Sequence, residues 1–163
     1  MLRVDQAGEY GATRIYAGQM AVLGDRHPCA RLIARMAAQE EHHLSSFDAL
    51  LAERGVRPTL LQPLWSAAGH ALGAATALIG PQAAMACTAA VEDEIDAHYS
   101  EQLASLGAEE PELAATIAEF QADERDHRDT AIAAGAEDSF GYPLLYAAIR
   151  AGCRAAIELS KRI

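Results

Sequence analysis

Two copies of a Glu-x-x-His motif have the residue types and the spacing that metal chemistry needs. Glu40 precedes His43 within residues 30–51, which are predicted to be helical, and Glu124 precedes His127. Two residues three apart on a helix project from the same side, and a carboxylate beside an imidazole can bind iron, manganese or zinc. One copy alone is more often a solvated helix face rich in Glu and His, but two copies at matching places favour a metal site.

The two motifs belong to an internal repeat. At an offset of 83 residues, which becomes 84 after the proline of the turn, the aligned pairs include Glu9 with Glu92, Tyr16 with Tyr99, Gly24 with Gly107, Glu40 with Glu124 and His43 with His127. Each half therefore holds one Glu, a turn and one Glu-x-x-His pair. Ferritin-like dimetal bundles use this set, with one Glu from each of two helices and Glu-x-x-His from each of the other two. The repeat predicts six metal ligands: Glu9, Glu40, His43, Glu92, Glu124 and His127.

Within this set, Glu40 and Glu124 are expected to bridge the two metals, because each lies on a helix that also supplies a histidine. Glu9 and Glu92 then act as terminal ligands. Four carboxylates and two imidazoles can hold two metal ions and leave positions open for dioxygen.

Several residues near the predicted ligands have types that suit a supporting role. Tyr16 lies two turns after Glu9 on the same face, where its phenol can donate a hydrogen bond near the site or pack as an ordinary core side chain. Asp123 and Asp126 are placed to orient a ligating imidazole through its other nitrogen. Gly8 and Gly11 flank Glu9, and because glycine is unfavourable in a helix, they indicate close packing or ligand approach there.

These ligands require four helices to position them. The sequence pattern predicts bundle helices at residues 2–23, 30–51, 82–106 and 111–134, and two apolar segments at residues 58–80 and 140–163. No strand pattern of alternating residues stands out. The predicted fold class is all-α, a ferritin-like four-helix bundle with two extra apolar helices. The whole chain, residues 1–163, is expected to form one domain, with repeats at 1–54 and 82–135.

Composition supports this class and excludes others. The 163 residues are 51% hydrophobic and 22% charged, which is enough apolar material for a sizeable core. The formal net charge of -10 argues against a nucleic-acid partner, since a phosphate backbone demands a basic surface. Four buried glutamates would need the compensating charge of two divalent ions. The three cysteines are far apart, and they indicate small buried residues in a reducing compartment.

The apolar segments have two alternative interpretations. Residues 58–91 contain no Asp, Glu, Lys or Arg, but the helix predicted at 64–79 is too short for a membrane span of about 20 residues and Gly80 and Pro81 interrupt it. It is expected to lie in a membrane interface, or else to be a buried connecting helix that packs closely through Gly69 and Gly73. The C-terminal segment has an excess of positive charge that anionic headgroups could meet.

Several motifs resemble those of the demethoxyubiquinone hydroxylase family of ubiquinone biosynthesis. They are Arg-Val-Asp-Gln-Ala-Gly-Glu-Tyr-Gly-Ala at 3–12, Arg-Ile-Tyr-Ala-Gly-Gln-Met at 14–20, Arg-Pro-Thr at 57–59, Pro-Leu-Trp at 63–65, Ala-Met-Ala-Cys-Thr at 84–88, His-Tyr at 98–99 and Ala-Gly-Cys-Arg at 151–154. The resemblance covers essentially the whole chain. It implies that the six predicted ligands occupy di-iron positions, so that the cofactor is two Fe ions, and that His98 and Tyr99 are redox-active or substrate-side catalytic residues.

The resemblance also implies a function and partners. The expected activity is ring hydroxylation of a polyprenyl quinol precursor with dioxygen, supported by a reductant such as NADH, a membrane surface and an accessory protein of the quinone pathway. The expected location is the cytoplasmic face of a bacterial inner membrane, with the matrix side of the mitochondrial inner membrane as the alternative. Since little sequence precedes the first motif, both stay open.

Two rival functions use the same ligands. A rubrerythrin-like peroxidase or iron-binding protein would not need an uncharged stretch of 34 residues. A non-catalytic membrane scaffold could retain a metal-stabilised bundle. Neither rival explains why an apolar surface should adjoin a metal site.

Overall fold

Six α-helices form the part of the chain that the computed structural model describes, residues 1–107 and 109–162. They are α1 (Leu2–Leu23), α2 (Ala30–Glu53), α3 (Gln62–Ile79), α4 (Pro81–Leu106), α5 (Pro111–Ala133) and α6 (Tyr142–Ser160), with a short 3-10 helix, η1 (Ala136–Asp138), before α6. No strand occurs among the described residues. The all-α prediction is confirmed, and the four predicted bundle helices end within two residues of the observed ones.

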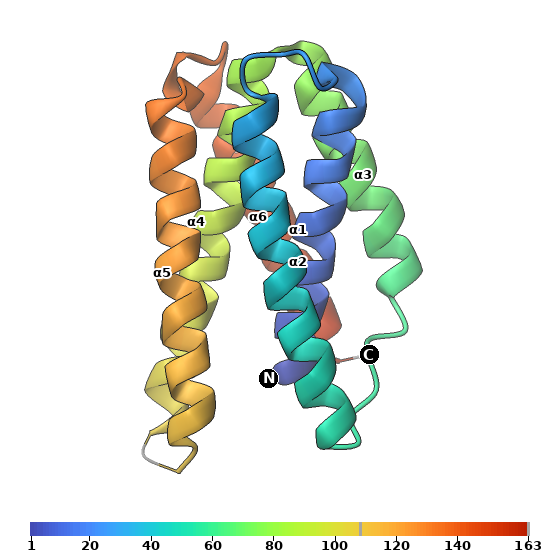
Figure 1. Cartoon of the computed structure of the whole chain (residues 1–163), viewed down its shortest axis with the longest axis vertical. Coiled ribbons are helices and arrows are strands. Elements are labelled where there is room, and N and C mark those ends of the chain that lie inside the picture. The colour runs from blue at the N-terminus through green and yellow to red at the C-terminus, as the bar shows by residue number, and fades with distance from the viewer. Residues whose placement is uncertain (108, 163) are drawn as a thin grey trace.

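The bundle consists of two antiparallel helix pairs, one from each half of the repeat (Figure 1). Helix α1 packs against α2, and α4 packs against α5. The first helix of each pair ends at an equivalent glycine, Gly24 or Gly107, with a φ of 68° or 58°. Because L side chains disfavour this left-handed region, glycine is the residue that permits the turn at both places.

The two apolar helices lie on one side of the bundle. Helix α3 packs on α1 and α4, and α6 packs on α4 and α1. They therefore cover α1 and α4, while α2 and α5 form the opposite side (Figure 1). This cover explains why α4 is the most buried helix. Its residues 83–92 are buried without interruption, and seven of those positions are Ala, Cys or Thr, small side chains that allow neighbours on every side.

Helix α3 packs closely on α1, as one of the two alternatives for this segment predicted. A Cβ atom on Gly73 would lie 2.0 Å from the carbonyl oxygen of Ile15, and one on Gly18 would lie 2.2 Å from that of His70. The helix backbones thus approach so closely that only glycine fits, which is the packing that one alternative predicted. The other face of α3 is exposed, with Leu78 at 75%.

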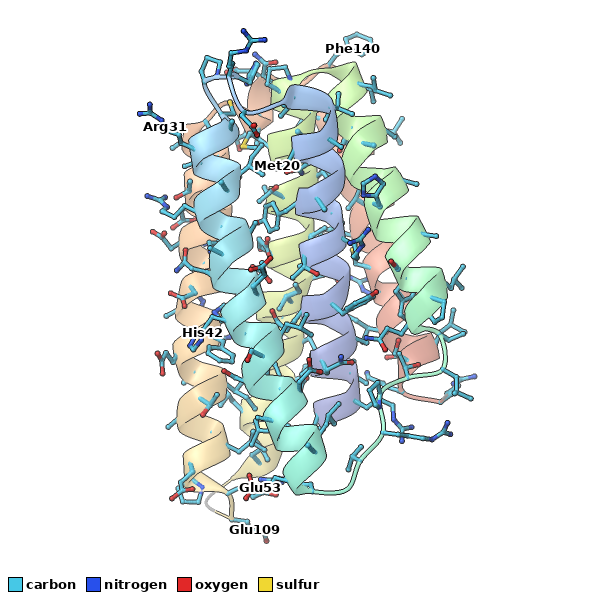
Figure 2. The ribbon with its side chains drawn as sticks, turned by 45° about the vertical axis from the view of Figure 1, so that its right-hand side comes forward. Met20, Arg31, His42, Glu53, Glu109 and Phe140 are labelled. Carbon is cyan, nitrogen blue, oxygen red and sulfur yellow. The ribbon has the colours of Figure 1, made fainter. Side chains whose placement is uncertain are left out.

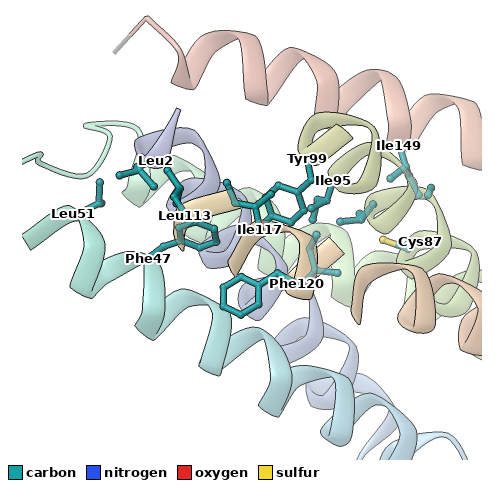
Figure 3. Close-up of a cluster of buried hydrophobic side chains, with 13 residues drawn as sticks. Leu2, Phe47, Leu51, Cys87, Ile95, Tyr99, Leu113, Ile117, Phe120 and Ile149 are labelled. Atoms are coloured by element: carbon teal, nitrogen blue, oxygen red, sulfur yellow. The ribbon is translucent and has the colours of Figure 1, made fainter. Parts of the chain in front are cut away.

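The core runs through the length of the bundle between the two helix pairs. One cluster joins Phe47 of α2 to Ile117 and Phe120 of α5 and to Tyr99 of α4 (Figure 3). The rings of Phe47 and Phe120 meet edge to face with centroids 5.6 Å apart, which is a favourable aromatic geometry. Tight apolar packing on this side separates the middle of the bundle from solvent.

The most exposed apolar side chains gather where α3 ends and α6 begins. Leu78 and Ile79 end α3, Phe140 is 97% exposed, and Leu144 is 79% exposed in the first turns of α6. Phe140 lies at one end of the bundle (Figure 2). No described helix has the length and apolar character to cross a bilayer.

Most of the basic side chains of the C-terminal segment, which were expected to meet anionic headgroups, form ion pairs within the protein. Arg150 and Arg154 both bind the carboxylate of Glu94 on α4, at 2.6 and 2.7 Å. Arg150 also lies 2.8 Å from Asp93. The sequence did not reveal these partners because they are more than 50 residues away, on the helix that α6 packs against.

Candidate metal centre

The structure brings all six predicted ligands together in the middle of the bundle. Each is buried, with at most 1% of the residue exposed. Their donor atoms form two groups, in each of which all atoms lie within 4.8 Å of one another; the first contains Glu9, Glu40, His43 and Glu124, and the second contains Glu40, Glu92, Glu124 and His127. Glu40 and Glu124 belong to both groups, so two ions held by these groups would share them.

The two histidines present their Nδ1 atoms to the carboxylates. His43 Nδ1 lies 3.1 Å from Glu124 Oε1 and 3.4 Å from Glu9 Oε2. His127 Nδ1 lies 3.0 Å from Glu40 Oε1 and 3.6 Å from Glu124 Oε2. Both Nδ1 atoms and both oxygens of Glu40 and Glu124 are buried without a hydrogen-bond partner. Buried polar atoms normally have partners, so this arrangement fits a divalent cation between them.

The other nitrogen of each histidine is held by the opposite half of the repeat. His43 Nε2 lies 3.1 Å from Asp123 Oδ2, and His127 Nε2 lies 3.0 Å from Gln39 Oε1. Gln39 and Asp123 occupy equivalent repeat positions, each just before a ligand glutamate. A hydrogen bond at Nε2 fixes the ring and leaves Nδ1 free to bind metal. Asp123 takes the orienting role that the sequence suggested, whereas Asp126 is exposed.

Two tyrosines likewise form hydrogen bonds between the two halves of the repeat. The Tyr16 hydroxyl donates to Glu92 Oε1 at 2.7 Å, and the Tyr99 hydroxyl donates to Glu9 Oε1. Burial, followed by the charges of neighbouring carboxylates, raises the pKa of both phenols well above their ordinary value. Both therefore remain protonated donors and hold the terminal carboxylates in place.

Without a metal, burial and the proximity of the carboxylates to one another disfavour their charged forms. Burial, followed by the charge of Glu124, raises the pKa values of Glu40 and Glu92 well above the ordinary value. Burial alone would lower the pKa of His43, but Glu124 and Glu9 outweigh it and raise the pKa to about 10. Positive ions between these groups would favour the charged carboxylates instead. The donor set therefore suits cations of high charge.

His98 lies beside this cluster without belonging to it. Its Nε2 is 2.9 Å from Asp5 Oδ1, and Gln102 donates to Asp5 Oδ2 at 2.8 Å. Asp5 is 2% exposed and accepts both bonds. Asp5 could not be recognised from the sequence pattern, because a lone acidic residue in a first helical turn carries no spacing signal.

A half-open apolar cavity of about 530 Å³ adjoins the cluster and is lined by α1, α3, α4 and α6. Glu9 and Tyr99 belong to its wall, as do His98 and Asp5. The rest of the lining is largely apolar and includes Trp65, Leu72, Ile95, Ile149 and Ile157. The cavity thus joins the ligand cluster to the side of the bundle that carries the two apolar helices.

Comparison with known proteins identifies the family. The model of the family described as "Ubiquinone biosynthesis protein COQ7" matches residues 1–160. The chain belongs to the COQ7 family.

Relatives from bacteria and eukaryotes agree with this assignment. The 3-demethoxyubiquinol 3-hydroxylase of Rhodospirillum rubrum is 54% identical over 162 residues, which cover 99% of this chain and 76% of that protein. The NADPH-dependent 3-demethoxyubiquinone 3-hydroxylase, mitochondrial, of Homo sapiens is 49% identical and covers 100% of this chain and 76% of that protein. The 5-demethoxyubiquinone hydroxylase, mitochondrial, of Saccharomyces cerevisiae is 44% identical, with coverage of 100% and 77%.

In this COQ7 chain, the residues that could not be recognised from the sequence alone contact predicted site residues. Gln39 supports His127, and Asp5 supports His98. The repeat contained a signal for Gln39, because Asp123 is its aligned partner and was already a candidate for orienting a histidine. Asp5 aligns with Thr88, which is neutral, so the repeat offered no such hint.

Proposed function

We propose that this protein is a di-iron monooxygenase that hydroxylates the ring of a demethoxyubiquinol precursor with dioxygen in ubiquinone biosynthesis. One observation carries the proposal. The cluster of six buried donors shares Glu9 with the wall of a large apolar cavity, so a hydrophobic substrate in that cavity would adjoin the metal site. The names of the relatives supply the substrate class.

Two Fe ions are the proposed cofactor. One ion would be held by Glu9 and His43, the other by Glu92 and His127, with the two glutamates common to both donor groups as bridges. Two imidazoles and four carboxylates are the ligand set of ferritin-like di-iron proteins. When bound, the iron pair supplies the activation of dioxygen.

The side chains around the cavity have separate roles in this proposal. The apolar lining excludes water and holds the ring of the substrate beside Glu9. Tyr16 and Tyr99 keep the terminal carboxylates fixed through their hydrogen bonds. His98 is oriented by Asp5 through its Nε2 atom and lines the cavity, where a quinol hydroxyl can meet its imidazole. His98 and Tyr99 are therefore proposed as catalytic residues.

The apolar helices are proposed to lie in the surface of a membrane. Leu78, Ile79, Phe140 and Leu144 are at the end shared by α3 and α6 and would enter the lipid, so that an isoprenoid tail reaches the cavity between those helices. The proposed location is the cytoplasmic face of a bacterial inner membrane or the matrix side of the mitochondrial inner membrane, and the eukaryotic relatives named above are mitochondrial. A reductant such as NADH and an accessory protein of the pathway complete the proposal.

The test is reconstitution with purified protein, ferrous iron, a reductant and a short-tailed demethoxyubiquinol analogue in air. Metal analysis should find two irons per chain, and mass spectrometry should find the hydroxylated quinol. Rapid consumption of added peroxide without hydroxylated product would favour the rubrerythrin-like peroxidase instead.

A further inference from the structure

Six glycines lie inside helices, Gly8, Gly11, Gly18, Gly69, Gly73 and Gly152. Glycine is the least favourable residue inside a helix apart from proline, so each position needs a physical reason. Three of the six have one in the protein itself. A Cβ on Gly18, Gly69 or Gly73 would meet a backbone atom of the neighbouring helix at 2.2, 2.9 or 2.0 Å, so these residues allow α1 and α3 to pack.

The other three have no such contact. No atom outside the local helix lies within 4 Å of a Cβ built on Gly8, Gly11 or Gly152. All three line the apolar cavity, Gly8 and Gly11 from α1 and Gly152 from α6. The protein therefore leaves open the space that a side chain would take at Gly8 and Gly11, which are half-buried, and at Gly152, which is exposed.

This space adjoins the polar part of the cavity wall. Gly8 precedes Glu9 in the chain, and Asp5 and His98 line the same cavity. Glycine at such a place lets a ligand approach the helix backbone closely. A flat ring needs that approach more than a flexible tail does, because the ring cannot bend around an added methyl group.

We propose that Gly8, Gly11 and Gly152 are specificity-determining residues that set the width of the cavity for a substituted quinol ring. The proposal rests on the proposed function, because it takes the ring of the substrate to lie in this cavity. The missing methyl groups of Gly8 and Gly11 make room for the ring along α1, which carries Glu9, and that of Gly152 makes room for its substituents from α6. An alanine at any of the three positions overpacks the bound complex while leaving the free protein well folded.

Binding of an oxidised, short-tailed demethoxyubiquinone analogue to iron-loaded protein tests this without turnover. Trp65 is the single tryptophan and lines the cavity, so its fluorescence reports occupancy. Gly8→Ala, Gly11→Ala and Gly152→Ala should each weaken binding by about tenfold. The same variants should lose less affinity for an analogue whose ring lacks methoxy groups. The ratio of the affinities for the two analogues should therefore change.

Stability and metal content separate this role from packing. The three variants should keep the iron content of the wild type, and their melting temperature should stay the same or rise, because alanine is the better helix former. Gly73→Ala is the matched control and should lower the melting temperature, since its Cβ meets the backbone of α1.

The outcomes distinguish the two proposals. If the iron-loaded wild type binds neither analogue, the proposed function fails, and the glycine proposal fails with it. If the wild type binds and hydroxylates but all three alanine variants bind with unchanged affinity and ring preference, only the glycine proposal is overturned. A lower melting temperature or lost iron in these variants would also overturn it, because a packing or metal-site role would then explain the glycines.

Discussion

At the scale of single residues, the candidate metal centre is held by bonds that cross between the two halves of the chain. Tyr16 of the first half donates to Glu92 of the second, and Tyr99 of the second donates to Glu9 of the first. The sequence predicted which six donors gather, because their spacing repeats. It did not predict the crossed bonds, since these depend on how the two halves face each other.

Removing one donor should remove metal. Glu92→Ala and His127→Ala each take away a buried donor of the second group, so iron content should fall well below two per chain and turnover should be lost. The measurement is elemental analysis of purified protein, with the exposed Glu119→Ala as the control. Full occupancy in either variant would exclude that residue from the site.

Removing the Nε2 partner of a histidine should have a smaller effect. Asp123→Asn keeps an oxygen that can accept from His43 but removes the charge, so iron affinity should fall by about tenfold or more. A chelator competition titration measures the change. Asp126→Asn, on the exposed side of the same helix, is the matched control and should leave affinity unchanged.

The metal-free protein should lose stability as the pH rises. The pKa values of Glu40, Glu92 and Glu124 are raised by burial first and neighbouring charge second, and that of His43 is raised to about 10. Between pH 6.5 and pH 10, the folded state therefore binds more protons than the unfolded state. The free energy of unfolding should fall by about 1.4 kcal/mol per pH unit for each extra proton.

His127 does not reverse this trend in that range. Burial lowers its pKa, so its opposing contribution is confined to the range just above pH 6.5, and at higher pH it is neutral in both states. Urea unfolding of chelated protein at several pH values measures the effect, and the iron-loaded protein, whose carboxylates are already charged, should show a much smaller decline. If the free energy of unfolding of the metal-free protein did not change with pH, the assigned burial of these carboxylates would be contradicted.

At the scale of helices, the fold followed closely from the sequence. Gly24 marks the C-terminal end of α1, and Pro111 marks the N-terminal start of α5. Both residues act locally, so the sequence alone predicts these boundaries. The pairing of α6 with α4 was not predicted, because Arg150 and Arg154 look like free cations until Glu94 is placed beneath them.

This pairing makes a prediction for α6. The side chain of Glu94 is 5% exposed, and its carboxylate forms ion pairs with two arginines. Glu94→Gln should therefore lower the free energy of unfolding by about 1 to 3 kcal/mol. Urea denaturation measures the change. Glu101→Gln on the exposed surface of the same helix should have little effect.

The paired arginines also change what membrane binding should depend on. Because little unpaired positive charge remains on α6, the protein should bind neutral and anionic vesicles similarly, through the exposed ends of α3 and α6. Leu78→Glu and Leu144→Glu should release it from sedimenting vesicles. Ala118→Glu on the exposed side of α5 adds the same charge elsewhere and should not. A wild type that fails to sediment with either vesicle would refute the membrane proposal.

Leu72 is not a suitable position for that test, although its apolar character matches that of Leu78 in the sequence. It packs against the core and lines the cavity, whereas Leu78 is 75% exposed. Six residues, less than two helical turns, separate a side chain that faces the cavity from one that faces solvent. Sequence alone could not tell these faces apart, because residues 58–91 contain no charged side chain to mark the outer one.

At the scale of the whole molecule, function depends on adjacency. The cavity exists because α3 and α6 both lie over α1 and α4, with Trp65 of α3 donating to Ser160 of α6 at 3.0 Å. Neither helix carries a metal donor, and neither repeat alone encloses the space. The sequence suggested that an apolar surface adjoins a metal site. The cavity in that surface depends on the arrangement of four helices, which the sequence does not show.

The decisive measurement of the central claim is the mass of the product formed under isotopically labelled dioxygen. The iron-loaded protein, given a demethoxyubiquinol analogue and a reductant, should yield a ring-hydroxylated quinol that carries one labelled oxygen atom. The electron-rich quinol ring resists attack by a water nucleophile, so the oxygen should not come from solvent. Hydroxylated product without the label, or no hydroxylated product from fully loaded protein, would contradict the account.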